Sequence, residues 1–262
     1  MTKKIAIIGA GNMGYALAVG LTKAGITAKN NIILSDKDKK KLAFCETEKF
    51  SVSTDNKKAV TMADIVFLAV KPHLVKDVLK DIQPVLKADR HILVSVAAKT
   101  TIDDIYSVIG NTLSVFIAIP NTAIALGESV TAISTRVKDK QIRSLVEKIF
   151  SSVGIAFMVE ESLLGAFVVL GSCGTAFAMR FIRALMLAGI EAGITPEMGK
   201  RVAAQVIKGA ANIILQSNGD PEKEIDKVAT PKGITISGLN EMEHQGFSAA
   251  VIKGVHTALK KA

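Results

Sequence analysis

The chain has 262 residues, a hydrophobic content of 49% and a formal net charge of +9 at pH 7. This composition excludes an intrinsically disordered chain, and the length allows one large domain or two modest ones. The basic residues are scattered and the aromatic content is 5%, so a stacking platform for single-stranded nucleic acid is absent and we expect no nucleic-acid partner.

The first two thirds of the chain alternate short strand-like runs with helical stretches. We expect strands at residues 4–8, 31–35, 50–53, 64–70, 91–96, 112–117, 129–134 and 154–159. Helices are expected at residues 12–24, 38–44, 72–86 and 139–150. Strands that are apolar on both sides and separated by helices predict a mainly parallel, doubly wound sheet that helices cover on both faces.

From about residue 161 the pattern becomes helical, with no further strand-like run. Thr195–Glu197 and Asp220–Glu222 each combine a capping side chain, a proline and an acidic first turn, which is typical of a helix start. The stretch Leu163–Met179 is uncharged over 17 residues, at the lower limit of about 17–25 residues for a membrane span. We expect it to be a buried helix in an interdomain or dimer core. The sequence thus predicts two domains, residues 1–160 (α/β) and 161–262 (all-α).

A glycine-rich motif, Gly9-Ala10-Gly11-Asn12-Met13-Gly14, directly follows the first strand and opens the first helix. In this G-x-G-x-x-G pattern the first glycine permits a tight turn, the second lets a diphosphate approach, and the third lets helix and strand pack closely. The helix start then offers unpaired N–H groups to phosphates. We therefore expect a Rossmann domain that binds NAD or NADP through these six residues.

The end of the second strand bears on the choice between the two dinucleotides. Asp36 lies 22 residues after Gly14, close to where an acidic side chain binds the adenosine ribose of NAD. Ser35, Lys37 and the lysines that follow could instead hold the 2′-phosphate of NADP. Both alternatives stay open at this point.

Further candidates for cofactor binding follow later strands, because ligands of open α/β sheets sit beyond the carboxyl ends of the strands. They are Ala69, Val70, Lys71 and Pro72 after the fourth strand, Ala97 and Ala98 after the fifth, and Asn121 after the sixth. The small side chains among them leave room for a flat nicotinamide ring.

Cysteine and histidine usage predicts neither disulfides nor metal. The two cysteines, Cys45 and Cys173, give no disulfide framework, and the four histidines fall at no metal-ligand spacing. The apolar run Ile5–Ala10 breaks at glycines and leads into a helix, unlike a signal peptide. We expect a soluble cytoplasmic protein without membrane association.

The chain resembles the 1-pyrroline-5-carboxylate reductase family over nearly its whole length. The resemblance rests on IAIIGAGNMG at 5–14, FLAVKP at 67–72, IPNT at 119–122, SSVG at 151–154, GAANIIL at 209–215, VATPKGITISGLNEME at 228–243 and QGFSAAVI at 245–252. It implies reduction of 1-pyrroline-5-carboxylate to L-proline by hydride transfer from NADPH or NADH, the final step of proline biosynthesis. It also implies a Rossmann domain with a helical dimerisation domain, assembled as a homodimer or as five dimers (a homodecamer).

The resemblance also implies residue roles, with a substrate site between the two domains. Thr235 would hydrogen-bond the imine nitrogen and is the candidate catalytic residue, in a polarising and orienting role. The candidate substrate-binding residues are Cys173, Thr175, Lys232, Gly233, Ile234 and Thr235, and the backbone N–H groups of the loop would hold the substrate carboxylate. Asn56 matches a family position that contacts the adenosine side of the cofactor.

Some residues depart from the family pattern. The family's Ser-Gly-Ser-Gly-Pro-Ala stretch is Gly-Ser-Cys-Gly-Thr-Ala at residues 171–176, and lysines replace family glycines at Lys99 and Lys232. These changes leave open two alternatives: a reductase or dehydrogenase of another small imine or hydroxy acid, and a dinucleotide-binding regulatory protein without turnover. A β-hydroxyacid dehydrogenase would need a catalytic lysine in the interdomain helix, and residues 163–179 contain none.

Overall fold

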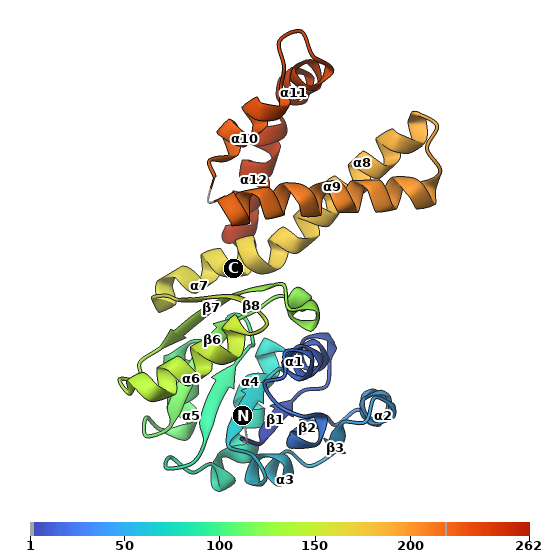
Figure 1. Ribbon diagram of the computed structural model, residues 1–262. Helices are drawn as coiled ribbons and strands as arrows, with labels where there is room; N and C mark the ends of the chain where they lie inside the picture. The colour runs from blue at the N-terminus through green and yellow to red at the C-terminus, as the bar shows by residue number, and fades with distance from the viewer. Residues whose placement is uncertain (1–2, 218) are drawn as a thin grey trace. The chain divides into compact units, whose positions relative to one another are not determined.

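The computed structural model describes residues 3–217 and 219–262, and its contacts divide the chain into two compact units (Figure 1). Unit 1 comprises residues 1–172 together with residue 262, and unit 2 comprises residues 173–261. The division falls inside a long helical stretch that begins at Leu164.

Unit 1 is built on an eight-stranded sheet, in which every expected strand is present. The strands are β1 (Ile5–Ile8), β2 (Ile32–Ser35), β3 (Ser51–Ser53), β4 (Ile65–Leu68), β5 (Ile92–Ser95), β6 (Ser114–Ile119), β7 (Ser129–Thr135) and β8 (Gly154–Met158). Their order is β3-β2-β1-β4-β5-β6-β7-β8. The pairs from β3 to β6 are parallel, β6 and β7 are antiparallel, and β7 and β8 are parallel to each other. The expected mainly parallel, doubly wound sheet is confirmed.

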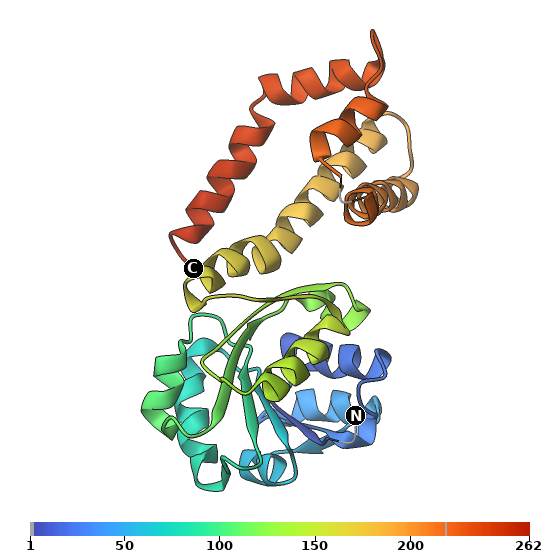
Figure 2. The same ribbon diagram turned by 60° about the vertical axis from the view of Figure 1, so that its left-hand side comes forward.

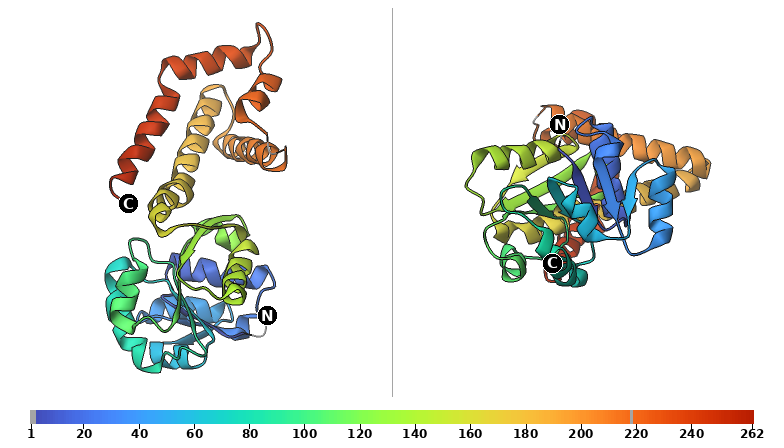
Figure 3. Two further views of the ribbon diagram at one scale, coloured as in Figure 1. Left: turned by 90° about the vertical axis from the view of Figure 1, so that its left-hand side faces the viewer. Right: turned by 90° about the horizontal axis from the view of Figure 1, so that it is seen from below.

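Alternate residues along the strands point to opposite faces of the sheet and belong to two separate hydrophobic cores. On one face Ile5 and Ile7 pack with helices α1 (Asn12–Lys23), α2 (Lys39–Thr47) and α6 (Lys140–Ser151). On the other face Ala6 and Ile8 pack with helices α3 (Asn56–Thr61), α4 (Val75–Ile82) and α5 (Ile102–Ile109). The right panel of Figure 3 shows α5 and α6 on opposite sides of the sheet. This alternation explains why the central strands read as continuous apolar runs.

Three helical details differ from the sequence-based expectation. Helices α3 and α5 were not expected; α5 begins with a capping box between Thr101 and Asp104, a start signal that is present in the sequence. The single helix expected at 72–86 is shorter, because α4 covers Val75–Ile82 and 3-10 turns flank it. Pro84 lies in the second of these turns and cannot donate a helical hydrogen bond.

Unit 2 contains helices and no strand among its described residues, as expected. Its helices are α8 (Gly174–Glu191), α9 (Pro196–Ser217), α10 (Pro221–Val228), α11 (Ile234–His244) and α12 (Phe247–Leu259). Helices α8 and α9 approach closely where a Cβ at Gly199 would lie 3.3 Å from the Met186 carbonyl oxygen. Figure 2 shows α11 and α12 joined by a sharp bend, where Gly246 has a φ of +78°. The rings of Phe181 and Phe247 then bring α12 against α8, with centroids 5.7 Å apart.

The long apolar stretch before and within α8 is exposed in the single chain. Residues Glu161–Glu191 form a helical segment long and apolar enough to cross a membrane by length and composition, and 11% of its most apolar window is buried. Leu170 and Met179 are 63% and 60% exposed. Leu164 and Val169 are buried, at 8% and 1% exposure, so the burial expected for Leu163–Met179 is met only in part by this chain.

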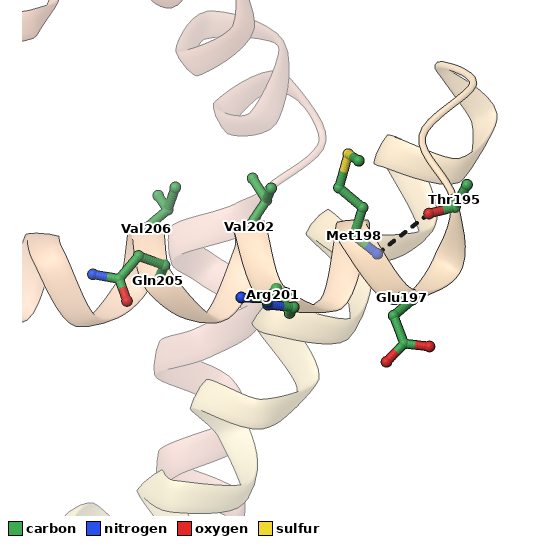
Figure 4. A pocket seen from close by; sticks show the side chains of 7 residues that line it. All are labelled: Thr195, Glu197, Met198, Arg201, Val202, Gln205 and Val206. Carbon is green, nitrogen blue, oxygen red and sulfur yellow. Dashed lines mark hydrogen bonds between the residues drawn. The ribbon is translucent and has the colours of Figure 1, made fainter.

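A second exposed apolar surface lies on α9. Figure 4 shows Met198, Val202 and Val206 projecting from one side of the helix, next to a hollow that Thr195 and Arg201 also line. The three apolar side chains follow one another at intervals of four residues and are 48–57% exposed. Such a stripe on a helix is typical of a surface that packs against another helix.

Candidate functional site

A cavity of about 650 Å³ lies at the carboxyl ends of β1, β2 and β4. In this sheet β1 lies between β2 and β4, so the chain winds in opposite directions on its two sides. A crevice at such a switch point is where open α/β sheets bind dinucleotides. The lining residues are Ile8, Gly9, Gly11, Asn12, Met13, Ser35, Asp36, Lys37, Lys41, Asn56, Ala69, Val70, Lys71, His73, Leu74, Asp77, Val78 and Asp81.

The three glycines of the motif meet three different spatial demands. Gly9 has a φ of +108°, and a Cβ there would lie 2.5 Å from the Ala69 carbonyl oxygen. A Cβ at Gly14 would lie 1.9 Å from the Gly9 carbonyl oxygen, so the close packing of α1 on β1 requires glycine. A Cβ at Gly11 would meet no atom within 4 Å and would project into open space. Gly11 lines the cavity, and its open surroundings leave room for a ligand to approach the backbone.

The start of α1 is free to receive an anion. Gly11 is the N-cap residue, no side chain caps the helix, and its first turn contains no acidic residue. The unpaired N–H groups and the positive end of the helix dipole therefore face the cavity with no competing carboxylate from the helix itself. This geometry fits the diphosphate of a dinucleotide.

Asp36 is fixed at the end of β2 by the glycine-rich turn. Its Oδ2 accepts a hydrogen bond of 2.9 Å from the Ala10 N–H, and its Oδ1 accepts one of 2.9 Å from the Asp38 N–H. The Lys41 ammonium lies 3.5 Å from Oδ2. The carboxylate is thus held at the cavity wall in one orientation, with its side chain 15% exposed.

A polar chain links Ser35 to helix α4 beneath the same part of the cavity. The Ser35 hydroxyl donates to Asn56 Oδ1 (2.8 Å), and Asn56 Nδ2 donates to Asp81 Oδ2 (3.1 Å). The other Asp81 oxygen lies 3.5 Å from the Lys57 ammonium. The side chains of Ser35 and Asn56 are therefore engaged with each other and with Asp81, although both residues line the cavity.

Sequence reasoning did not identify the wall that α4 and the turn before it supply. His73, Asp77 and Asp81 recur every four residues and line the cavity. The signal was present in the sequence, because polar residues at this spacing lie on one face of a helix. With Asp36 and three lysines (Lys37, Lys41 and Lys71), the lining carries three aspartates and three lysines.

Several predicted cofactor residues lie outside the lining of this cavity. Ala10 and Gly14 support the turn from behind it, and Pro72, Ala97 and Ala98 also lie outside. Asn121 is 7% exposed, and its amide is already used: Nδ2 donates to the Gly171 carbonyl and Oδ1 accepts from the Ala123 N–H. In this structure Asn121 ties the end of β6 to the helical stretch at residue 171.

The predicted substrate-binding residues lie in unit 2. Lys232 and Gly233 lie in the connection from α10 to α11, at the tip of this helical unit in the left panel of Figure 3, and Ile234 and Thr235 are the first residues of α11. Helix α11 starts at Ile234, with Gly233 as an N-cap that offers no side-chain hydrogen bond, so its first N–H groups are uncapped. Thr235 is half-buried in this first turn. Cys173 and Thr175 flank the start of α8.

Two lysines have a backbone conformation that glycine adopts more readily. Lys99 and Lys232 both have a φ of +60°, in the left-handed region that costs a residue with a Cβ about 1–2 kcal/mol. The loops after β5 and before α11 therefore follow a glycine-like path.

The described residues contain no group of three or more histidine, cysteine or acidic side chains that could hold a metal ion. Cys45 and Cys173 are both unpaired.

Two family patterns match the chain, one in each part. The pattern described as "Pyrroline-5-carboxylate reductase dimerisation" matches residues 161–262. The pattern described as "NADP oxidoreductase coenzyme F420-dependent" matches residues 4–99, which include the glycine-rich turn, β2 and β4.

Curated relatives are similar over the full chain. The chain is 37% identical to "Pyrroline-5-carboxylate reductase 2" of Dictyostelium discoideum, in an alignment that covers 99% of this chain and 92% of the relative. It is also 37% identical to "Pyrroline-5-carboxylate reductase 1" of the same organism over 98% of this chain, and it spans about half (49%) of that longer relative. Among solved structures, the pyrroline carboxylate reductase of Plasmodium falciparum with NADP bound superposes with a TM-score of 0.89 at 27% identity, covering 99% of this chain and 97% of that one.

Proposed function

The chain belongs to the pyrroline-5-carboxylate reductase family, and from that premise we propose how its own residues carry out the family's reaction. The chain is an oxidoreductase that reduces 1-pyrroline-5-carboxylate to L-proline with NAD(P)H, in proline biosynthesis. The observation that carries this conclusion is the near-complete match to curated reductases at 37% identity. The cavity at the switch point of the sheet supplies the physical counterpart, because its glycine turn and uncapped helix start fit a dinucleotide diphosphate.

We propose that unit 1 holds the dinucleotide with its diphosphate on the N–H groups at the start of α1. The backbone around Gly11 then approaches the phosphates, and Asp36 receives the adenosine ribose. Lys71 and its neighbours after β4 continue toward the nicotinamide, with Ala97, Ala98 and Asn121 as further expected contacts. When bound, the reduced nicotinamide supplies the hydride. We place the boundary of this domain at residues 160/161, which is supported by the dimerisation pattern starting at residue 161.

The proposed substrate contacts come from the connection between α10 and α11. The uncapped N–H groups at the start of α11 would receive the substrate carboxylate, and the Lys232 ammonium adds a positive charge beside them. Cys173 and Thr175 at the start of α8 are the other expected contacts. A protonated imine is already an electrophile, so the protein acts mainly by orienting it, an effect that can supply about 7–11 kcal/mol.

Thr235 is proposed to donate or accept a hydrogen bond at the imine nitrogen and thereby orient the ring. We expect Thr235→Val to lower kcat/KM by about 10- to 100-fold, the effect of losing one hydrogen bond in the transition state. The variant should bind reduced dinucleotide with wild-type affinity, because Thr235 belongs to the other unit. Steady-state kinetics together with a fluorescence titration of the nucleotide would measure both quantities.

Thr235→Ser is the matched control, because it keeps the hydroxyl and removes one methyl group. It should retain kcat/KM within a few-fold of the wild type. An unchanged kcat/KM in Thr235→Val would remove Thr235 from the proposed mechanism.

The chain carries a dimerisation domain and forms a homo-oligomer. We propose a homodimer as the basic assembly, with a decamer of five dimers as the larger form. The support is exposed apolar surface: Leu170 before α8, Met179 in α8, and the stripe of Met198, Val202 and Val206 on α9. A second copy would cover these side chains. We further propose a cytoplasmic location, which the two unpaired cysteines support.

A further inference from the structure

We infer that Asp36 makes this enzyme select NADH over NADPH, an inference that rests on the proposed dinucleotide site. The two nucleotides differ only in the group at the adenosine 2′ position, which is a hydroxyl in NADH and a phosphate in NADPH. Asp36 follows β2 directly and lines the cavity where the ribose end of a dinucleotide would lie. The question is therefore which of the two groups this wall can accept.

The Asp36 carboxylate is oriented to accept hydrogen bonds and cannot easily move away. Both of its oxygens are held at 2.9 Å by backbone N–H groups, from Ala10 in the glycine turn and from Asp38. Oδ1 still has a lone pair for a further donor, while Oδ2 also accepts a long hydrogen bond of 3.5 Å from the Lys41 ammonium. Ribose hydroxyls are donors and can use these lone pairs. A 2′-phosphate offers acceptor oxygens and negative charge, so it would meet a fixed anion.

The nearest cation does not reverse this preference. The Lys41 ammonium lies 3.5 Å from Asp36 Oδ2 and 3.9 Å from Asp38 Oδ2, so two carboxylates already share its charge. A phosphate that recruited Lys41 would have to compete with both of them. Lys37 directly follows Asp36, also lines the cavity, and could receive a phosphate. It is therefore the rival determinant that an experiment must separate from Asp36.

The hydrogen-bonded side chains of Ser35, Asn56 and Asp81 beneath the site also disfavour a 2′-phosphate. Ser35 could have donated a hydrogen bond to a phosphate, but its hydroxyl donates to Asn56 Oδ1. Asn56 donates one of its two amide N–H groups to Asp81, which fixes the orientation of the side chain. Asp81 then places a second carboxylate on the cavity wall. The adenosine end thus presents acceptors and has few donors to spare for a phosphate.

The experiment measures binding rather than turnover, on the purified full chain. Fluorescence titrations give the dissociation constants of NADH and NADPH, and calorimetric titrations compare AMP with 2′,5′-ADP, which carry the adenosine end alone. We expect NADH to bind at least about tenfold more tightly than NADPH, a factor that corresponds to about 1.4 kcal/mol. AMP should likewise bind more tightly than 2′,5′-ADP.

Three variants assign the preference to a residue. Asp36→Asn removes the negative charge and keeps an acceptor, so it should bring the NADPH and NADH dissociation constants within about threefold, mainly through tighter NADPH binding. Asp139→Asn is the matched control, because Asp139 also caps a helix, α6, and does not line the cavity; its preference should equal that of the wild type. Lys37→Ala should also leave NADH preferred.

The outcomes separate this inference from the proposed function. Wild-type protein that binds NADPH as tightly as NADH, or more tightly, would overturn the inference while leaving the dinucleotide site in place. Loss of NADPH binding alone in Lys37→Ala would then identify Lys37 as the determinant. Wild-type protein that binds neither nucleotide would overturn the proposed function as well. If Asp36→Asn fails to fold, the wild-type ratio and the AMP comparison still decide the question.

Discussion

At the scale of single residues, the glycines of the turn after β1 have two different roles, close helix packing and room for a ligand, and mutations can distinguish them. A Cβ at Gly14 would lie 1.9 Å from the Gly9 carbonyl oxygen, so Gly14→Ala must displace α1 from β1. Gly11→Ala meets no protein atom within 4 Å, and its methyl group would project into open space at the cavity lining. We expect Gly14→Ala to lower the melting temperature strongly, and Gly11→Ala to stay folded but bind NADH at least about tenfold more weakly.

Thermal unfolding and an NADH titration of both variants test these two roles. Each variant serves as the control for the other, because both make the same chemical change three residues apart. Wild-type NADH affinity in a well-folded Gly11→Ala would show that no phosphate approaches this backbone.

The glycine turn and Asp36 could be predicted from the sequence because their roles depend on local spacing. Asp36 directly follows the strand next to the turn and accepts a hydrogen bond from the Ala10 N–H. Asn121 could not be interpreted in the same way. Its hydrogen-bond partner, Gly171, lies 50 residues further along the chain, and a local sequence pattern cannot predict such a contact.

At the scale of elements, Asp64 joins the beginnings of β1 and β4 to the loop before β5. It accepts hydrogen bonds from the Lys4 N–H at 2.9 Å and from the Arg90 guanidinium at 3.2 Å. Burial raises the pKa of Asp64, but these two hydrogen bonds and the charge of Arg90 outweigh it and leave the pKa below its usual value. Because the folded pKa is lowered, the charged form stabilises the fold.

We expect Asp64→Asn to lower the free energy of unfolding at pH 7 by about 1–2 kcal/mol. The stabilisation is complete above the pKa of the unfolded aspartate, about 3.9, and is lost as the pH falls through the lower folded value. The difference between wild type and variant should therefore shrink below about pH 4. Urea unfolding at several pH values measures it, and Asp89→Asn provides an exposed carboxylate as the control. A difference that stays constant with pH would contradict this account.

Elements with a strong apolar pattern could be predicted, and those defined by a few polar residues could not. All eight strands were expected, most clearly β1, β4 and β5, in which every side chain is buried and the sequence is a nearly continuous apolar run. Helix α3 has six residues, two of them lysines, and it owes its start to Asp55, which accepts from the Lys58 N–H. Such a short polar helix is stabilised by its packing rather than by its own sequence.

At the scale of the whole molecule, unit 2 exposes more apolar surface than a separate domain would keep in water. Val202 lies in the middle of the α9 stripe and is 48% exposed (Figure 4). We expect Val202→Glu to weaken the homo-oligomer, because it would place a charge in an apolar interface. Light scattering after size-exclusion chromatography measures the effect as a lower mass at micromolar concentration.

Lys200→Glu on the same helix is the control, since it changes charge at a residue whose side chain is 65% exposed. It should keep the mass of the wild type. A Val202→Glu protein with unchanged mass would exclude this stripe from the interface. The sequence could predict that α8 and α9 are apolar, but only a second chain determines which of their faces become buried.

The central claim is that this chain reduces 1-pyrroline-5-carboxylate to proline with a reduced nicotinamide nucleotide. The most direct measurement incubates the purified chain with pyrroline-5-carboxylate and NADH or NADPH, and follows both nucleotide absorbance and the proline formed. The account predicts one proline for each nucleotide oxidised, with no reaction when the chain is omitted. Nucleotide binding without any proline formation would contradict it.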